Sequence, residues 1–139
     1  MVIIMTIINV GIDPKELPDK LLLAEHREIT RIPNMVLSGR ADLSKPIPLG
    51  FTLGKGHVRF FYNKLIYLRD RYYLLYEECL RRGFRVTDKS EIFSGIESGN
   101  YFPSEKDRET IINRIESKGF YLRREDVRDR HEEFIGAEL

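Results

Sequence analysis

Residues 51–83 carry the strongest structural signal in the chain. Apolar side chains recur there at intervals of three and four residues, at Val58, Phe61, Leu65, Leu68, Tyr72, Leu75, Cys79 and Leu80. This spacing places them on one face of an α-helix of about six turns. Gly83 follows two arginines and is typical of the residue that ends a helix. The pattern therefore predicts one long amphipathic helix in the middle of the chain.

Two further helices are predicted on either side of it. The first begins near Pro18 or Asp19 and is ended or kinked by Pro33. The second spans residues 103–118, with Ser104 as its N-cap and a buried stripe at Ile111, Ile112 and Ile115. Both are half-buried by their residue patterns.

The remaining segments favour irregular structure. Residues 3–10 are rich in β-formers but isolated, which predicts a short extended arm, and residues 38–50 and 87–99 are predicted to be loops. The charged tail, residues 120–139, favours a turn or two of helix around 125–134. We therefore expect an all-α fold, a compact single-domain helical bundle with long loops that spans residues 1–139, with almost no strand.

Several classes of protein are excluded by composition. A single cysteine, Cys79, rules out a disulfide framework and a cysteine-based metal site, and three scattered histidines argue against a histidine-rich one. No stretch approaches the roughly 20 apolar residues needed to cross a bilayer. Residues 2–8 are apolar, but they are too short for a signal peptide and lack a basic leader. We expect a cytoplasmic, unsecreted monomer without metal or cofactor.

The net charge of +1 hides an uneven distribution. Residues 54–85 hold eight basic and three acidic side chains, a balance of +5, whereas residues 1–53 are neutral and residues 86–139 carry −4. A basic middle beside an acidic tail predicts a polarised surface, so the average charge does not exclude a nucleic-acid partner.

The first candidate site lies on the first predicted helix. Arg27 and Arg31 are four residues apart and share a helix face with Glu28 beside them. One interpretation is a solvated charged face. The other is a carboxylate held among phosphate-binding arginines, with Glu28 as the acid/base or charge-stabilising group.

Two more candidates carry positive charge. Residues 54–57, Gly-Lys-Gly-His, lead into the basic helix, and glycines let a backbone approach a phosphate closely, but the spacing is not that of a P-loop. A lone histidine such as His57 is more often a helix cap or a core residue than a catalyst. Arg114 and Lys118, four apart, form either a solubilising face or a contact to a DNA backbone.

Three segments together resemble a known family. Residues 51–65, continuing to residue 84, resemble the central helix of the pyrimidine-dimer DNA glycosylases of the bacteriophage endonuclease V type. Residues 23–31 (Leu-Ala-Glu-His-Arg-Glu-Ile-Thr-Arg) resemble that family's first-helix motif, and residues 101–118 line up without gaps. The resemblance covers roughly residues 5–118.

The resemblance implies a compact all-α enzyme that acts on double-stranded DNA without a cofactor. Members excise one base of an ultraviolet-induced pyrimidine dimer and then nick the abasic site. The α-amine of an N-terminal threonine forms a Schiff base with the sugar, and a first-helix glutamate stabilises it. By resemblance, Thr6 and Glu28 are the catalytic residues. The implied DNA contacts are Arg27, Arg31, Arg114 and Lys118, and we add Lys55 and His57 from the lead-in to the central helix.

The chain departs from the family pattern in ways that leave alternatives open. Five residues precede Thr6, so we expect Met5 to be the true initiator and residues 1–5 a non-native extension. Ile7 and Leu21 replace a family arginine and histidine, and the chain has no tryptophan. The same chemistry on another lesion or on abasic sites alone therefore remains open, as does a non-catalytic nucleic-acid-binding module.

Overall fold

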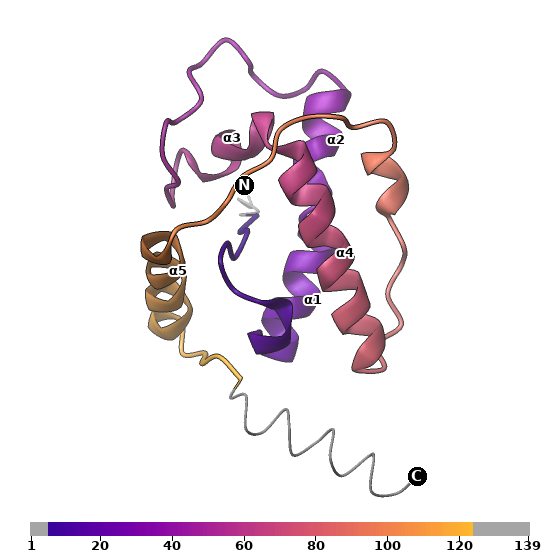
Figure 1. Cartoon of the computed structure of the whole chain (residues 1–139), viewed down its shortest axis with the longest axis vertical. Helices are drawn as coiled ribbons and strands as arrows, with labels where there is room; N and C mark the ends of the chain where they lie inside the picture. The colour runs from indigo at the N-terminus through magenta and orange to yellow at the C-terminus, as the bar shows by residue number, and fades with distance from the viewer. Residues whose placement is uncertain (1–5, 124–139) are drawn as a thin grey trace, which may run out of the picture.

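The computed structural model describes residues 6–123, and helix α4 (Leu65–Arg81) lies at its centre (Figure 1). Helix α1 (Asp19–Glu28) packs along α4 and continues, after a break, into α2 (Arg31–Leu37). Helix α5 (Glu105–Ser117) lies on the other side of the N-terminal arm, residues 6–12 (Figure 1). No strand occurs within residues 6–123, so the predicted all-α fold is confirmed.

The central helix is shorter than predicted because it is broken in the middle of the pattern. Helix α3 (His57–Phe60) runs into a 3₁₀ turn, η2 (Phe61–Asn63), and Lys64 then leaves helical geometry at φ −129° and ψ 44°. The segment around Gly99 crosses this point, where the Tyr67 N–H donates to the Gly99 carbonyl at 3.2 Å. A Cβ on Gly99 would lie 2.5 Å from the Asn63 carbonyl oxygen, so only glycine fits this crossing.

The break in the first predicted helix lies one turn before Pro33 rather than at it. Pro33 lies inside the first turn of α2, where a missing N–H costs nothing, and the break falls at Ile29 and Thr30. A proline ring clashes with the carbonyl four residues before it, which here belongs to Ile29. The helix is therefore interrupted before the proline and does not end at it.

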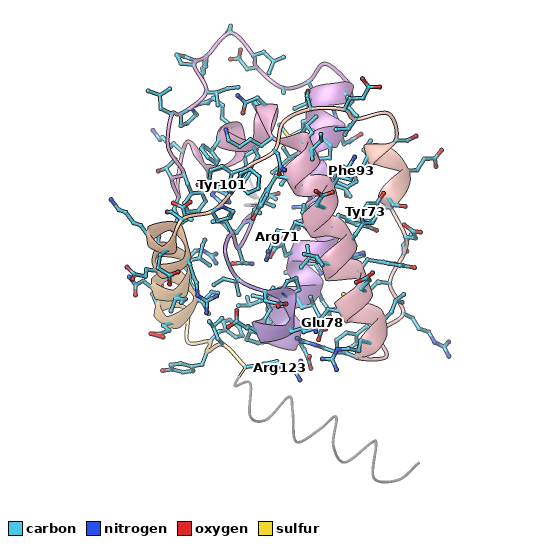
Figure 2. The ribbon with its side chains drawn as sticks, viewed as in Figure 1. Arg71, Tyr73, Glu78, Phe93, Tyr101 and Arg123 are labelled. Atoms are coloured by element: carbon cyan, nitrogen blue, oxygen red, sulfur yellow. The ribbon has the colours of Figure 1, made fainter. Side chains whose placement is uncertain are left out.

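The segment predicted as a polar loop at 87–99 contains a 3₁₀ turn, η3 (Ser90–Phe93), whose Phe93 is buried against α4 (Figure 2). The second flanking helix, by contrast, follows its pattern. Ser104 caps α5 in a capping box with Asp107, and Ile111 and Ile115 are fully buried. Ile112 is only half-buried.

The N-terminal arm forms no helix or strand and is buried at Ile8, Val10 and Ile12. It is not extended throughout as predicted, because it turns at Val10 and Gly11, where the Ile12 N–H donates to the Asn9 carbonyl at 3.3 Å. A third 3₁₀ turn, η1 (Pro14–Glu16), connects it to α1. The arm is held by Arg71 of α4, which lies between that helix and the arm (Figure 2). The Arg71 guanidinium donates to the Ile12 carbonyl at 2.9 Å and binds both carboxylate oxygens of Glu25 on α1.

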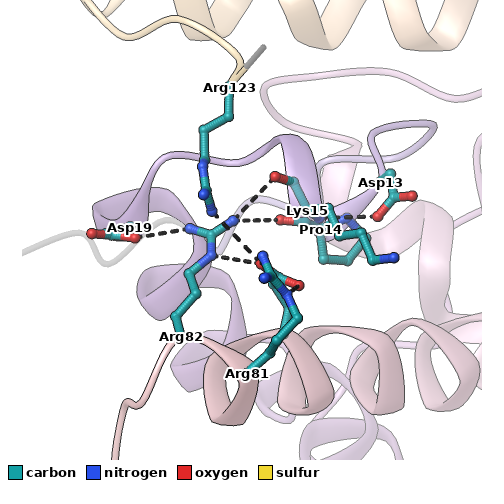
Figure 3. Close-up of polar contacts among 8 residues, drawn as sticks. Asp13, Pro14, Lys15, Asp19, Arg81, Arg82 and Arg123 are labelled. Carbon is teal, nitrogen blue, oxygen red and sulfur yellow. Dashed lines mark hydrogen bonds and ion pairs between the residues drawn. The ribbon is translucent and has the colours of Figure 1, made fainter. Parts of the chain in front are cut away.

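A second cluster joins the far ends of α1 and α4 (Figure 3). Arg82 binds Glu78 at 2.7 Å and Asp19 at 2.9 Å, and it donates to the carbonyls of Pro14 and Lys15. The side chain of Arg123, which follows α5, approaches Glu78 to 3.7 Å. The helix predicted around 125–134 lies outside the described residues, and no helix within 6–123 is long and apolar enough to span a membrane.

The buried pair between Glu25 and Arg71 predicts a large effect of removing one partner. Arg71→Met leaves the Glu25 carboxylate buried without a counter-charge, so we expect the free energy of unfolding to fall by about 3–5 kcal/mol in urea denaturation. Arg69→Met is the matched control, because its partner Asp70 is exposed, and it should cost less than about 1 kcal/mol. Equal losses in the two variants would contradict this account.

Candidate active site

Two hollows meet at Arg31, the first residue of α2. The first, about 440 Å³, is lined by Thr6, Arg31, Ile32, Met35, Val58 and Tyr62, and we call it the Thr6 hollow. The second, about 340 Å³, is lined by Arg27, Thr30, Arg31, Asn34, Lys89 and Ile92, and we call it the basic hollow. The Arg31 side chain thus borders both.

Glu28 is connected to the two hollows by its ion pair with Arg31. Its Oε1 lies 3.2 Å from an Arg31 guanidinium nitrogen, across the junction between α1 and α2. The Glu28 side chain is 16% exposed and that of Arg31 is 38% exposed. The carboxylate is therefore largely sheltered from solvent and paired with a cation that borders both hollows.

The three residues that precede Glu28 on α1 lie in different surroundings. Glu25 and His26 point into the core, where Glu25 binds Arg71 and His26 Nε2 lies 3.2 Å from the Tyr72 hydroxyl. Arg27 is exposed at the basic hollow. Four consecutive residues therefore divide into a buried pair, Glu25 and His26, an exposed Arg27 and a half-buried Glu28.

Lys89 is a site residue that the sequence did not suggest. Its main-chain N–H donates to the Tyr72 hydroxyl at 2.6 Å, and its Nζ donates to the Arg27 carbonyl at 3.4 Å. Burial lowers the pKa of His26. The positive charge of Lys89 lowers that pKa further, whereas the negative charge of Asp88 raises it. The residue lies in a segment without helical periodicity, so no spacing pointed to it. It adds a third cation to the basic hollow beside Arg27 and Arg31.

Thr6 begins the described part of the arm and is 7% exposed, at the edge of the hollow named after it. Two residues later, the Ile8 N–H donates to His57 Nε2 at 2.9 Å. The arm is thus fixed close to Thr6. Thr6 and Arg31, which lie far apart in the sequence, line the same hollow, and Glu28 pairs with Arg31.

His57 is a correction to the predicted set of DNA contacts. Its side chain is 1% exposed, and both ring nitrogens bind main-chain groups, Ile8 N–H and the Thr52 carbonyl. A ring so enclosed has no free atom for a phosphate or a base. His57 is therefore a core histidine, which was the alternative interpretation of this residue in the sequence.

The remaining predicted DNA contacts, Lys55, Arg114 and Lys118, line neither of these two hollows. Lys55 is exposed in the turn before α3. Arg114, half-buried on α5, has a pKa lowered by burial, and its charge acts on His57. Lys118 is exposed at the C-cap of α5. Their contact with DNA stays a prediction.

Acidic and histidine side chains do not gather into a metal site here. Within residues 6–123, no group of three or more His, Cys, Asp or Glu side chains is placed to hold a metal ion.

A family model described as pyrimidine dimer DNA glycosylase matches residues 5–92. The chain belongs to this family. The matched segment contains the arm, α1 to α4 and both hollows, so Thr6, Arg27, Glu28, Arg31 and Lys89 all lie within it. Helix α5, with Arg114 and Lys118, lies beyond the match. A member of a DNA glycosylase family acts on DNA that carries damage.

The basic hollow predicts a salt-dependent contribution to DNA binding. Lys89→Ala removes one phosphate-neutralising charge, so the slope of log K against log salt for a damaged duplex should become shallower by about 0.9. Fluorescence anisotropy over a salt series measures it. Lys15→Ala, which removes an exposed lysine at the far end of α1, is the control and should leave the slope unchanged. Equal slopes for both variants and the unmodified protein would exclude Lys89 from the interface.

Proposed function

We propose that this protein is a DNA glycosylase with abasic-site lyase activity that excises ultraviolet-induced pyrimidine dimers through a Schiff base on the α-amine of Thr6. One observation carries the proposal. Thr6 borders the same hollow as Arg31, and the Arg31 guanidinium is paired with Glu28 at 3.2 Å. All three residues lie in the segment that matches the glycosylase family. We further propose that the enzyme works as a cytoplasmic monomer.

The proposal requires Thr6 to be the first residue of the working protein. In the 139-residue chain the Thr6 nitrogen is a peptide amide, whose lone pair is delocalised and does not attack carbon. Initiation at Met5 followed by methionine removal frees it as an amine. An α-amine has an ordinary pKa of about 7.7–8.0, and the positive charge of Arg31 at the same hollow favours its neutral, nucleophilic form.

The first step is displacement of the base. The lone pair of the Thr6 amine attacks C1′ of the damaged nucleotide, the glycosidic bond breaks, and the base leaves with the bonding electrons and takes up a proton. The ring oxygen then leaves C1′ and accepts a proton, so that C1′ and the Thr6 nitrogen share a protonated double bond. Extrusion of a nucleotide costs least where the duplex is already distorted.

Glu28 contributes to the second step. Its carboxylate stabilises the positive charge of the Schiff base and accepts a proton from C2′, after which the 3′ phosphate leaves and the strand is cut. Water then hydrolyses the Schiff base and restores the amine. Arg27, Arg31 and Lys89 hold phosphates on either side of the reacting sugar.

Borohydride trapping tests the proposal. Borohydride reduces a Schiff base to a stable amine, so the Thr6-first protein should form a covalent complex with a duplex that carries a pyrimidine dimer. The same protein beginning at Met1 should bind the duplex without trapping, because its Thr6 nitrogen is acylated. Glu28→Gln in the Thr6-first form should lower the single-turnover cleavage rate by about 10²–10³ while DNA affinity changes little.

Two outcomes would contradict the proposal. Equal trapping by the Met1-first and Thr6-first proteins would place the nucleophile elsewhere. An unchanged cleavage rate in Glu28→Gln would remove the carboxylate from the reaction, with Glu116→Gln on the exposed surface of α5 as the matched control.

A second candidate is the same chemistry on abasic sites alone or on another lesion. The family match ends at residue 92, and the whole sequence has no tryptophan, the residue type that the phage-type tail supplies for dimer recognition. A panel of duplexes with a pyrimidine dimer, an abasic site and an oxidised base separates the candidates. Cleavage confined to the abasic duplex would favour the second.

A further inference from the structure

The glycine-rich segment before α3 forms a tight turn rather than a phosphate cradle. Gly54 has a φ of +72°, and the His57 N–H donates to the Gly54 carbonyl at 3.1 Å. A Cβ on Gly56 would lie 2.9 Å from the Thr52 methyl and 3.0 Å from Cγ of Pro48. The two glycines therefore allow the chain to turn closely against residues 48–52, and the turn directs the His57 ring inward.

The partners of the His57 ring determine its tautomer. A main-chain N–H can only donate, so Nε2, which lies 2.9 Å from the Ile8 nitrogen, is the unprotonated acceptor. A carbonyl can only accept, so Nδ1 carries the proton that it donates to Thr52 at 2.9 Å. A single neutral form of the ring satisfies both bonds, and a second proton would remove the acceptor that Ile8 uses.

The surroundings hold the ring in this neutral form. Burial lowers the pKa of His57, and the charge of Arg114 from α5 lowers it as well, while the Thr52 carbonyl and Glu25 from α1 oppose them. Phe51 and Phe61 pack edge-on against the ring with centroids 5.5 and 5.3 Å away. The imidazole is thus fixed in position as well as in protonation.

The bond to Ile8 is the anchor of the arm closest in sequence to Thr6. The other anchors lie farther along the chain: Asn9 to Glu25 at 2.7 Å, the Gly11 carbonyl to Arg108 at 2.9 Å and the Ile12 carbonyl to Arg71 at 2.9 Å. Without the His57 bond, no described hydrogen bond would join the residues before Asn9 to another element, and packing contacts, which have no direction, would hold them.

We infer that His57, presented by the Gly54–Gly56 turn, is a positioning residue that holds the N-terminal arm so that the α-amine of Thr6 stays at the Thr6 hollow. The inference rests on the proposed function, in which that amine is the nucleophile. His57 touches neither DNA nor the reacting atoms. It acts through the Ile8 main chain, two residues from the nucleophile.

Two variants in the Thr6-first protein separate the acceptor from the shape of the ring. His57→Phe keeps an aromatic ring among Phe51 and Phe61 but has no acceptor for Ile8. His57→Gln places its Oε1 at the same number of bonds from the backbone as Nε2 and restores an acceptor. Cys79→Ala, a core change near the other end of α4, controls for stability loss alone.

Single-turnover trapping on an abasic duplex and equilibrium DNA binding provide the two readouts. A misplacement of about 1 Å can cost on the order of 10²-fold in rate. His57→Phe should therefore react at least about ten times more slowly at saturating DNA, with Kd within about twofold, and His57→Gln should recover much of the rate. Amide hydrogen exchange at Ile8 should accelerate in His57→Phe and remain protected in His57→Gln and Cys79→Ala.

An unchanged trapping rate in His57→Phe, or unchanged hydrogen exchange at Ile8 in that variant, would overturn the inference. So would a loss of DNA affinity as large as the loss of rate, because it would indicate that His57 contacts DNA directly. Absence of trapping by the unmodified Thr6-first protein is a different result. It would overturn the proposed function, and with it the role of His57 in that reaction, whatever the exchange at Ile8.

Discussion

The buried ion pair between Glu25 and Arg71 is the interaction on which the rest of the structure depends. Removing two charges from water is expensive, and their mutual attraction compensates only when the remaining polar atoms are also bonded. Here Arg71 binds both carboxylate oxygens and the Ile12 carbonyl, and Glu25 also accepts from the Asn9 side chain. Glu25 raises the pKa of Arg71 against the opposing effect of burial. One pair thus joins the N-terminal arm, α1 and α4.

This pair and the site share one helix. Glu25 lies one turn before Glu28 on α1, and it faces the core while Glu28 pairs with Arg31, which lines both hollows. Fixing Glu25 against α4 therefore also fixes the direction in which Glu28 and Arg27 point. The same contacts align the arm, whose first described residue is Thr6. A structural carboxylate and a proposed catalytic one are separated by a single helical turn and by opposite surroundings, which is how one short motif serves both purposes.

Local patterns were sufficient for those parts of the fold that depend on near neighbours. The cap at Ser104 and the stripe at Ile111 and Ile115 were predictable because propensity and spacing determine them. The break before α4 was not, because it depends on the close approach of Gly99, more than 30 residues away in the sequence. The burial of Phe93 in a polar segment likewise depends on a surface of α4 that only the folded chain provides.

The site residues also differ in whether local sequence patterns could indicate them. The spacing of Arg27, Glu28 and Arg31 was visible in the sequence, whereas Thr6 was suggested only by resemblance to a family. Lys89 was missed because its place at the basic hollow comes from the Tyr72 hydroxyl, 17 residues away. His57 was predicted to bind DNA because nothing in its spacing shows that Ile8, 49 residues earlier, uses its acceptor. Roles that depend on long-range hydrogen bonds cannot be predicted from periodicity.

The central claim is that the anchored arm presents the α-amine of Thr6 to the damaged sugar. The most direct measurement is to reduce the complex of the Thr6-first protein with an abasic duplex, digest it with trypsin and nuclease, and locate the sugar-phosphate remnant by tandem mass spectrometry. The account predicts the remnant on the α-nitrogen of Thr6, in the tryptic peptide 6–15. A remnant on a lysine side chain, such as Lys55 or Lys89, would contradict it.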